Sequence, residues 1–251
     1  DDHGQGAGAS SGRCPMKPAG MQASLAVVVG ATGAFGRQIV ARLLDRGLSV
    51  LAVARTASSL AALEKAFPSI RPCIADLASD AAIEAIAGAV DEPVRMVVHG
   101  PGVAVAGGIL NAPTEAVVDA VNIKVGGMLR LVRAVDPWLG KSSRLVAIGG
   151  HYGFEPTAYA AAAGIANAAL ANLMRQLSLV YGERGITAHL IAPGPADTDR
   201  LRRVAADRAT QRGPSVEQVM AEMVTESSIH AMTTLRWPGP SPCCSTLKRM
   251  P

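Results

Sequence analysis

The chain has 251 residues, of which 49% are hydrophobic, 26 are glycine and only 3% are aromatic. This length and composition exclude a disordered protein and suit one packed α/β domain, and the scarcity of aromatic side chains argues against stacking on single-stranded nucleic acid. The net charge is +4, from 24 Lys and Arg against 20 Asp and Glu, and the basic residues are scattered along the chain, so we expect no nucleic-acid partner.

No segment of the chain has the features of a membrane span or a secretory signal. No apolar run reaches the roughly 18–20 residues of a membrane helix, and residues 1–20 contain no hydrophobic stretch. Those residues are rich in Gly, Ser and Pro, which predicts a disordered leader before a natural start at Met21. Only Cys73 lies in the patterned region, so neither a disulfide framework nor a metal site is expected. We therefore predict a cytoplasmic protein without a membrane partner.

Strand and helix patterns alternate along the chain. Strands are predicted at the apolar runs 25–29, 48–53, 72–75, 94–99, 143–148 and 187–192. Helices are predicted at 37–46, 58–66, 81–90, 113–135, 158–181, 200–208 and 216–223. Continuous apolar strands between helices indicate a single α/β domain over residues 21–234, a Rossmann-type doubly wound parallel sheet. Such a sheet binds its ligand at the carboxyl ends of the strands.

A glycine-rich turn, GATGAFG at residues 30–36, follows the first predicted strand and leads directly into a helix. Backbone amides in such a turn can approach a pyrophosphate, and the helix N-terminus favours its negative charge. A glycine-rich turn without a ligand is the alternative, but the position after the first strand favours a dinucleotide. The predicted contacts in this turn are Gly30, Thr32, Gly33, Phe35 and Gly36.

The end of the second predicted strand indicates which dinucleotide binds. An acidic residue there would bind the adenosine ribose and repel a 2′-phosphate, but Arg55 and Thr56 follow the strand instead. Arg55 can pair with a 2′-phosphate and Thr56 can donate a hydrogen bond to it. NADP(H) is therefore predicted in preference to NAD(H), with a solvent-facing arginine as the alternative.

From about Ala23 to Thr234 the chain resembles the short-chain dehydrogenase/reductase family. The family's glycine motif G-x-x-x-G-x-G is matched by Gly30, Ala34 and Gly36, so its middle glycine is lost. The segment 99–102 stands where the family has N-N-A-G, and the segment 193–198 matches P-G-x-x-x-T. The resemblance implies further cofactor contacts at Asp76, Leu77, Gly100, Pro101, Gly102, Pro193, Gly194 and Thr198.

The resemblance also implies a catalytic serine, tyrosine and lysine, and this chain lacks all three. Ungapped overlays on both sides of the site put Gly150 at the serine position, Ala163 at the tyrosine position and Asn167 at the lysine position. An alanine has no proton to donate, and an asparagine can hydrogen-bond a ribose but carries no charge. Loss of the proton donor alone forfeits about 10²–10⁴ in rate.

Nearby residues are candidates for a substitute acid. His151 follows the serine position and can polarise a carbonyl, although a partly exposed loop histidine is the alternative. Tyr159 lies one turn before the tyrosine position and Tyr152 lies close by, with packing at the helix start as the alternative for Tyr159. Asn122 matches the asparagine with which the family organises a water relay. It is a further catalytic candidate, or else a structural hydrogen-bonding residue between helix and strand.

Two hypotheses for the function follow. The first is an oxidoreductase that reduces a carbonyl or oxidises an alcohol with NADP(H), using an atypical acid. The second is a non-catalytic dinucleotide-binding sensor or scaffold. The resemblance implies a substrate-covering lid around residues 200–230 and a homodimer or homotetramer. Alanines in the predicted helix 158–181 indicate close helix approach, either at a subunit interface or within one subunit.

The segment 235–251 does not continue the family's pattern, because closely spaced prolines and two adjacent cysteines replace the expected helix and last strand. With one choice of codons, another reading frame encodes AVAWAVALLLDPEADA, which fits that helix and the turn after it. We predict that this tail is frameshifted and that the C-terminal strand is missing. Resequencing the gene around Thr234 tests this prediction, and an intact original frame there would refute it.

Overall fold

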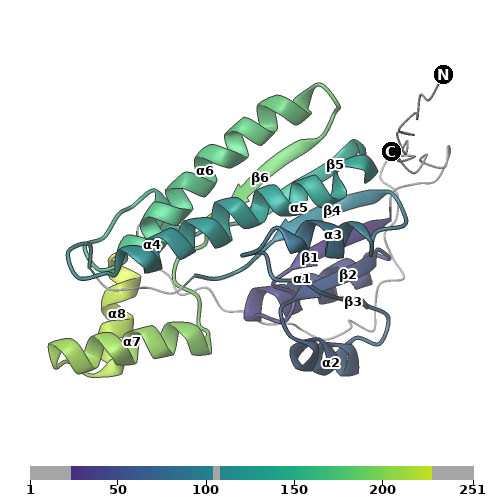
Figure 1. Ribbon diagram of the computed structural model, residues 1–251. Coiled ribbons are helices and arrows are strands. Elements are labelled where there is room, and N and C mark those ends of the chain that lie inside the picture. Colours follow the sequence, from purple (N-terminus) through teal and green to yellow (C-terminus); the bar gives the residue numbers. More distant parts are fainter. Residues whose placement is uncertain (1–23, 104–107, 228–251) are drawn as a thin grey trace, which may run out of the picture.

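Six parallel strands form one sheet in the order β3-β2-β1-β4-β5-β6 in the computed structural model, which describes residues 24–103 and 108–227 (Figure 1). The strands are β1 (Leu25–Val29), β2 (Ser49–Ala54), β3 (Arg71–Ile74), β4 (Val94–His99), β5 (Leu139–Ile148) and β6 (Thr187–Ile191). The predicted doubly wound α/β fold is therefore confirmed. The predicted leader, the end of the predicted domain at Thr234 and the tail 235–251 lie outside the described residues.

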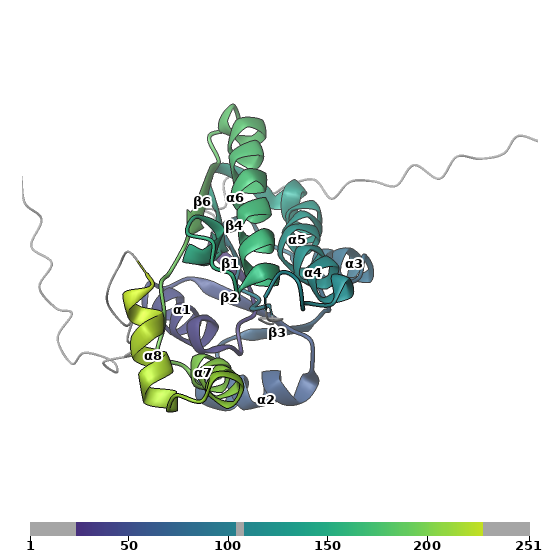
Figure 2. The same ribbon diagram turned by 90° about the vertical axis from the view of Figure 1, so that its left-hand side faces the viewer.

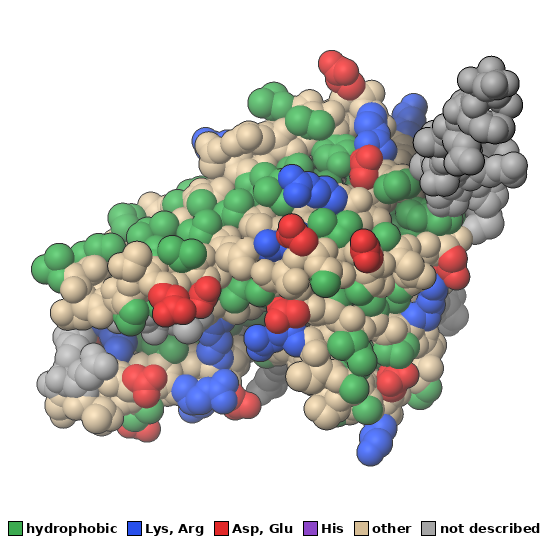
Figure 3. Space-filling model, in the orientation of Figure 1, with side chains coloured by type: hydrophobic (Ala, Val, Ile, Leu, Met, Phe, Trp, Pro, Cys, Tyr) green, Lys and Arg blue, Asp and Glu red, His purple; other side chains and the backbone are tan. Residues whose placement is uncertain are grey.

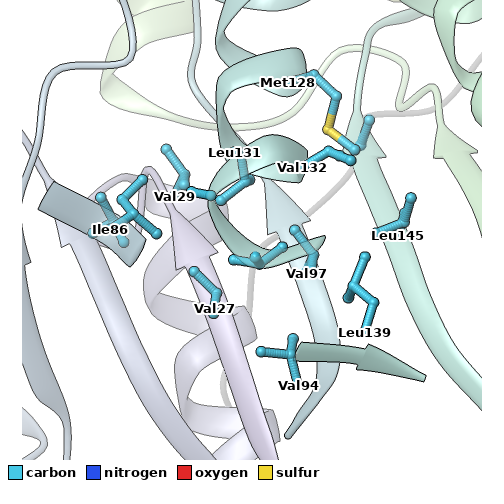
Figure 4. Close-up of a cluster of buried hydrophobic side chains, with 14 of the residues drawn as sticks. Val27, Val29, Ile86, Val94, Val97, Met128, Leu131, Val132, Leu139 and Leu145 are labelled. Carbon is cyan, nitrogen blue, oxygen red and sulfur yellow. The ribbon is translucent and has the colours of Figure 1, made fainter. Parts of the chain in front are cut away.

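Helices cover both faces of the sheet, as its continuously apolar strands require. They are α1 (Ala34–Asp45), α2 (Ala57–Ala66), α3 (Ala81–Ala87), α4 (Thr114–Val121), α5 (Gly127–Val135), α6 (Ala161–Gly182), α7 (Asp199–Arg212) and α8 (Val216–Thr225). Side chains of β1 alternate between the two cores: Val27 packs among residues of α3, α5 and α6, whereas Val28 packs among residues of α1 and α2. Figure 2 shows these layers, and Figure 4 shows Val27 and Val97 of the sheet beneath Met128 and Leu131 of α5.

Several predicted boundaries move when the fold is known. The predicted helix 37–46 begins at Ala34, directly after the glycine-rich turn. The predicted helix 158–181 begins at Ala161, so Tyr159 precedes the helix instead of lying on its first turn. The strand predicted at 143–148 is longer in the structure, where β5 extends from Leu139 to Ile148. The residues at which a helix begins and ends depend on its tertiary contacts, and the periodicity of the sequence does not show these contacts.

The predicted helix 113–135 is interrupted by a π-helical segment, Asn122–Gly126, between α4 and α5. Its wider turn lies over the end of β4, where the Nε2 atom of His99 is 3.2 Å from the carbonyl oxygen of Ile123. His99 is fully buried, and desolvation, followed by the charge of Lys124, lowers its pKa to about 3. The imidazole is therefore neutral and acts as a packing residue beneath the segment.

Helices α7 and α8 form a pair beside the carboxyl ends of the strands (Figure 1). They share a small apolar core of Ala205, Val219 and Met223. The hydroxyl of Thr198 caps the start of α7, and Ser215 and Gln218 form a capping box at the start of α8. The pair occupies the region where the sequence predicted a lid.

The alanines of α6 lie largely inside the subunit. Ala162, Ala163 and Ala166 pack with Ala120 of α4 in one buried cluster, so intramolecular packing accounts for them. Hydrophobic side chains also cover the outer surface of α4 and α6 (Figure 3). The predicted oligomer stays a prediction. Within the described ranges, no helix combines the length and apolar character needed to cross a bilayer.

Candidate functional site

A cavity of about 580 Å³ opens at the carboxyl ends of β1, β4 and β5. Its position matches the crevice that a doubly wound sheet forms where the strand order reverses, here between β1 and β4. Its volume is typical of a small-molecule site. The wall combines the glycine-rich turn, the loops after β4 and β5, the start of α6, and residues of α7 and α8.

The glycine-rich turn packs against the loop after β4 at a distance that only glycine permits. Gly30 has a φ of +78°, and a Cβ there would lie 3.0 Å from the carbonyl carbon of Gly100. A Cβ at Gly36 would overlap the carbonyl oxygen of Gly30. The turn therefore carries the N-terminus of α1 to the cavity, where the unpaired amides of its first turn can bind a phosphate.

The residues predicted to bind the adenosine end lie beside the cavity and not in its wall. Arg55 and Thr56 follow β2, and both are exposed. The hydroxyl of Thr56 accepts a hydrogen bond from the backbone amide of Ser59 and so caps α2. Because β1 and β2 are parallel and Val29 pairs with Val53, Arg55 lies at the same sheet edge as the glycine-rich turn.

Three other predicted cofactor contacts also lie outside the cavity wall. Thr32 is not part of the wall, which contains Gly30 and residues 33–36 of the same turn. The carboxylate of Asp76 accepts a hydrogen bond from the amide of Ala78 at 3.0 Å, which shapes the turn after β3. Leu77 is buried, and its carbonyl oxygen accepts a hydrogen bond from Arg130 at 2.8 Å. By contrast, Gly100, Pro101, Gly102, Pro193, Gly194 and Thr198 all line the cavity.

Gly150, Ala163 and Asn167 meet in the cavity wall, as their predicted register requires. A Cβ at Gly150 would lie 2.9 Å from the Nδ2 atom of Asn167, so the amide occupies space that a serine side chain would need. The Oδ1 atom of Asn167 is buried and has no hydrogen-bond partner among the described residues. A buried acceptor of this kind suits a ligand hydroxyl, such as that of a ribose. The cavity thus fits a dinucleotide.

His151, Tyr152 and Tyr159 also line the cavity. His151 is buried rather than partly exposed, its Nε2 atom has no hydrogen-bond partner within the described chain, and burial lowers its pKa. The hydroxyls of Tyr152 and Tyr159 are hydrogen-bonded to each other. Burial is the main cause that raises the pKa of both phenols, so both keep their protons at neutral pH.

Asn122 lies outside the cavity wall. Its Nδ2 atom donates to the carbonyl oxygen of Ala78 at 3.0 Å, and its Oδ1 atom accepts from the guanidinium of Arg130 at 2.8 Å. The side chain therefore joins the π-helical segment to the turn after β3, not to a strand. This placement corrects its selection as a catalytic candidate and assigns it a structural role.

The sequence analysis missed a buried cation in the cavity. Lys124 of the π-helical segment is only 4% exposed, and its Nζ atom donates to the carbonyl oxygen of Ile148 at 2.7 Å. Desolvation, followed by the charge of Arg200, lowers its pKa to about 8. Arg200 and Arg203 of α7 also line the cavity. The one available signal was a lysine within the apolar stretch 120–128.

Comparisons with known proteins agree with this geometry. The family model for short chain dehydrogenase matches residues 24–209. An uncharacterised oxidoreductase of Staphylococcus epidermidis is 26% identical over 180 residues, which is 69% of this chain and 78% of the relative.

Two solved structures share the fold. A blue fluorescent protein from a metagenomic library, in complex with NADPH, is 25% identical with a TM-score of 0.71, and the match covers 85% of this chain and 86% of that one. An NADPH-bound short chain oxidoreductase of Pseudomonas aeruginosa PAO1 with an atypical catalytic center is 20% identical with a TM-score of 0.67, over 88% and 97% of the two chains.

Substitution of Gly36 by alanine tests the glycine-rich turn. Because the added Cβ would overlap the carbonyl oxygen of Gly30, we expect Gly36→Ala to destabilise the fold by about 1–3 kcal/mol and to weaken NADPH binding. Gly182→Ala is the control, since its Cβ would meet nothing within 4 Å and the residue lies at the end of α6, outside the cavity wall. Thermal unfolding and fluorescence titration with NADPH provide the measurements. Equal NADPH affinity of Gly36→Ala and Gly182→Ala would contradict the prediction.

Proposed function

The chain belongs to the short-chain dehydrogenase family, and from this membership we propose that it is an NADP(H)-dependent oxidoreductase that reduces carbonyl compounds. The observation that carries the proposal is the hydrogen-bonded phenol pair of Tyr152 and Tyr159 in the same cavity as the glycine-rich turn. The pair supplies a proton donor in a site whose usual tyrosine position holds Ala163.

The residues of the cavity wall are suited to bind a dinucleotide in the orientation typical of this fold. The first turn of α1 would bind the diphosphate, and the unpartnered Oδ1 atom of Asn167 would accept a hydrogen bond from a ribose hydroxyl. A bound nicotinamide supplies the hydride for carbonyl reduction.

The preference for NADP(H) is supported at the end of β2. No acidic side chain follows the strand there, and the guanidinium of Arg55 is exposed beside the N-terminus of α2. A cation and a helix N-terminus together favour a 2′-phosphate. The blue fluorescent protein that shares this fold is a complex with NADPH.

The two phenols can complete the proton side of the reaction. As hydride reaches the carbonyl carbon, Tyr159 donates its proton to the carbonyl oxygen, so that the product is an alcohol and Tyr159 becomes a phenolate. The hydroxyl of Tyr152 can then donate to that phenolate, and the Arg208 guanidinium lies 3.6 Å from the centre of the Tyr159 ring. Both groups stabilise the negative charge that the step creates.

Removal of the cation at the end of β2 tests the cofactor preference. Arg55→Ala should weaken NADPH binding by about tenfold, the effect of losing one charge-assisted hydrogen bond of roughly 1.4 kcal/mol, and should leave NADH affinity unchanged. Lys65→Ala is the control, because it removes an exposed cation from the last turn of α2, the helix that follows Arg55. Fluorescence titration measures both affinities. Parallel losses for NADPH and NADH would exclude Arg55 as a contact to the 2′-phosphate.

Removal of one phenol tests the proton donor. With NADPH and a panel of aldehydes and ketones, we expect Tyr159→Phe to lower kcat by about 10²–10⁴ without a change in NADPH affinity. Because burial raises the pKa of Tyr159, titration of this phenol should not lower the rate of reduction of uncharged carbonyl compounds between about pH 6 and 9, whereas alcohol oxidation, which needs the phenolate, should rise with pH.

Tyr181→Phe is the matched control for this prediction, because its hydroxyl binds Asp136 and lies outside the cavity wall. Loss of kcat in His151→Ala but not in Tyr159→Phe would identify the imidazole as the donor instead. Tight NADPH binding without turnover of any carbonyl would favour the non-catalytic sensor or scaffold.

A further inference from the structure

Three cationic side chains face the cavity without an acidic partner: Lys124 at its floor, and Arg200 and Arg203 at its rim. We propose that they form a binding subsite for an anionic group of the substrate, so that the preferred substrates are carbonyl compounds that carry a carboxylate or a phosphate. This inference rests on the proposed function and specifies its substrate class.

Lys124 carries the strongest part of the argument. Its ammonium is buried at the end of β5, and the hydrogen-bond partner that the structure gives it is the carbonyl oxygen of Ile148, at 2.7 Å. Within the described chain, no carboxylate lies in ion-pair contact with it. Burial of a charge is costly unless a counter-charge compensates it. An ammonium has three donors, so Lys124 can bind an anion while it keeps its bond to Ile148.

The two arginines extend this positive charge to the rim. The guanidinium of Arg200 lies directly against Gly102 in the loop after β4. Partial burial, followed by the charge of Arg203, lowers the pKa of Arg200, which indicates that the two guanidiniums repel each other. Figure 3 shows basic side chains gathered over α7. A ligand anion between them would relieve this repulsion.

Two other arginines of α7 already have acidic partners. Arg202 pairs with Asp197 at 2.8 Å, and Arg208 pairs with Glu226 at 3.3 Å. Within the described ranges, Asp199 is the one acidic residue in the cavity wall. It is exposed and makes no ion pair with Lys124, Arg200 or Arg203. Arg202 and Arg208 thus have acidic partners, whereas Arg200 and Arg203 make no ion pair among the described residues and can bind a ligand anion.

The diphosphate of the cofactor is the other source of an anion for this cluster. The glycine-rich turn already offers a phosphate site at the N-terminus of α1, next to β1. Lys124 instead lies at the end of β5, beside Gly149 and Gly150, where the reacting end of a substrate would lie. This separation favours the substrate as the source, and the experiment has an arm for each.

Pyruvate and acetone test the subsite, because they present the same ketone with and without a carboxylate. Isothermal titration into protein saturated with NADP⁺, which cannot reduce either probe, measures binding without turnover. We expect pyruvate to bind at least about tenfold more tightly than acetone, which corresponds to about one charge-assisted contact. Lys124→Met and Arg203→Gln should each remove most of this preference. Arg202→Gln is the matched control, with the same charge loss on the same helix.

The outcomes separate this inference from the proposed function. Equal binding of pyruvate and acetone, or an equal loss in Arg202→Gln and Arg203→Gln, would overturn the subsite and leave the proposed function intact. Weaker NADP⁺ binding in Lys124→Met and Arg203→Gln, with no preference for pyruvate in the unmodified protein, would assign the cluster to the cofactor's phosphates and also overturn it. Failure of the unmodified protein to bind NADPH would refute the proposed function, and pyruvate titration without cofactor would still decide the subsite.

Discussion

The close approach of the glycine-rich turn to the loop after β4 is the constraint on which the site depends. Gly30 can adopt its positive φ and lie against the backbone of Gly100 only because Gly30 has no side chain. Gly36 in turn lets α1 start directly beneath the carbonyl oxygen of Gly30. The helix N-terminus and the ends of β1 and β4 thereby meet at one edge of the sheet, and the cavity forms between them.

The three residues that the sequence analysis assigns to the family's catalytic positions are close to one another in the cavity wall. The amide of Asn167 fills the space that a serine side chain at position 150 would need, and Ala163 packs into the cluster between α4 and α6. Tyr152 and Tyr159, the proposed proton donors, precede α6 instead of lying on it, and their hydroxyls are hydrogen-bonded to each other.

The π-helical segment places a positively charged side chain, Lys124, in the cavity wall. Its wide turn lies over neutral His99 and directs Lys124 to the carbonyl oxygen of Ile148. Such segments occur often at functional sites, because one extra residue in a turn redirects a side chain without breaking the helix. Asn122, at the start of the same segment, anchors it to the turn after β3 through Ala78.

The sequence alone determined the architecture, and from local order it predicted the register of the site. Continuous apolar strands between amphipathic helices allow only a covered parallel sheet, and the glycine-rich turn and the positions of Gly150, Ala163 and Asn167 depend on local order in the chain. Their meeting in one cavity wall follows from that register. These features are local or repeat with a fixed period, so a linear sequence contains them.

Only the tertiary structure decided which charges face the ligand. The match to the family's asparagine selected Asn122, but the π-helical segment, which the sequence did not reveal, holds Asn122 at the turn after β3 and places the overlooked Lys124 in the cavity wall. Arg200 and Arg202 lie two residues apart on α7, yet one lines the cavity and the other pairs with Asp197. The electrostatic environment of each side chain depends on segments distant along the chain, and the fold alone brings those segments together.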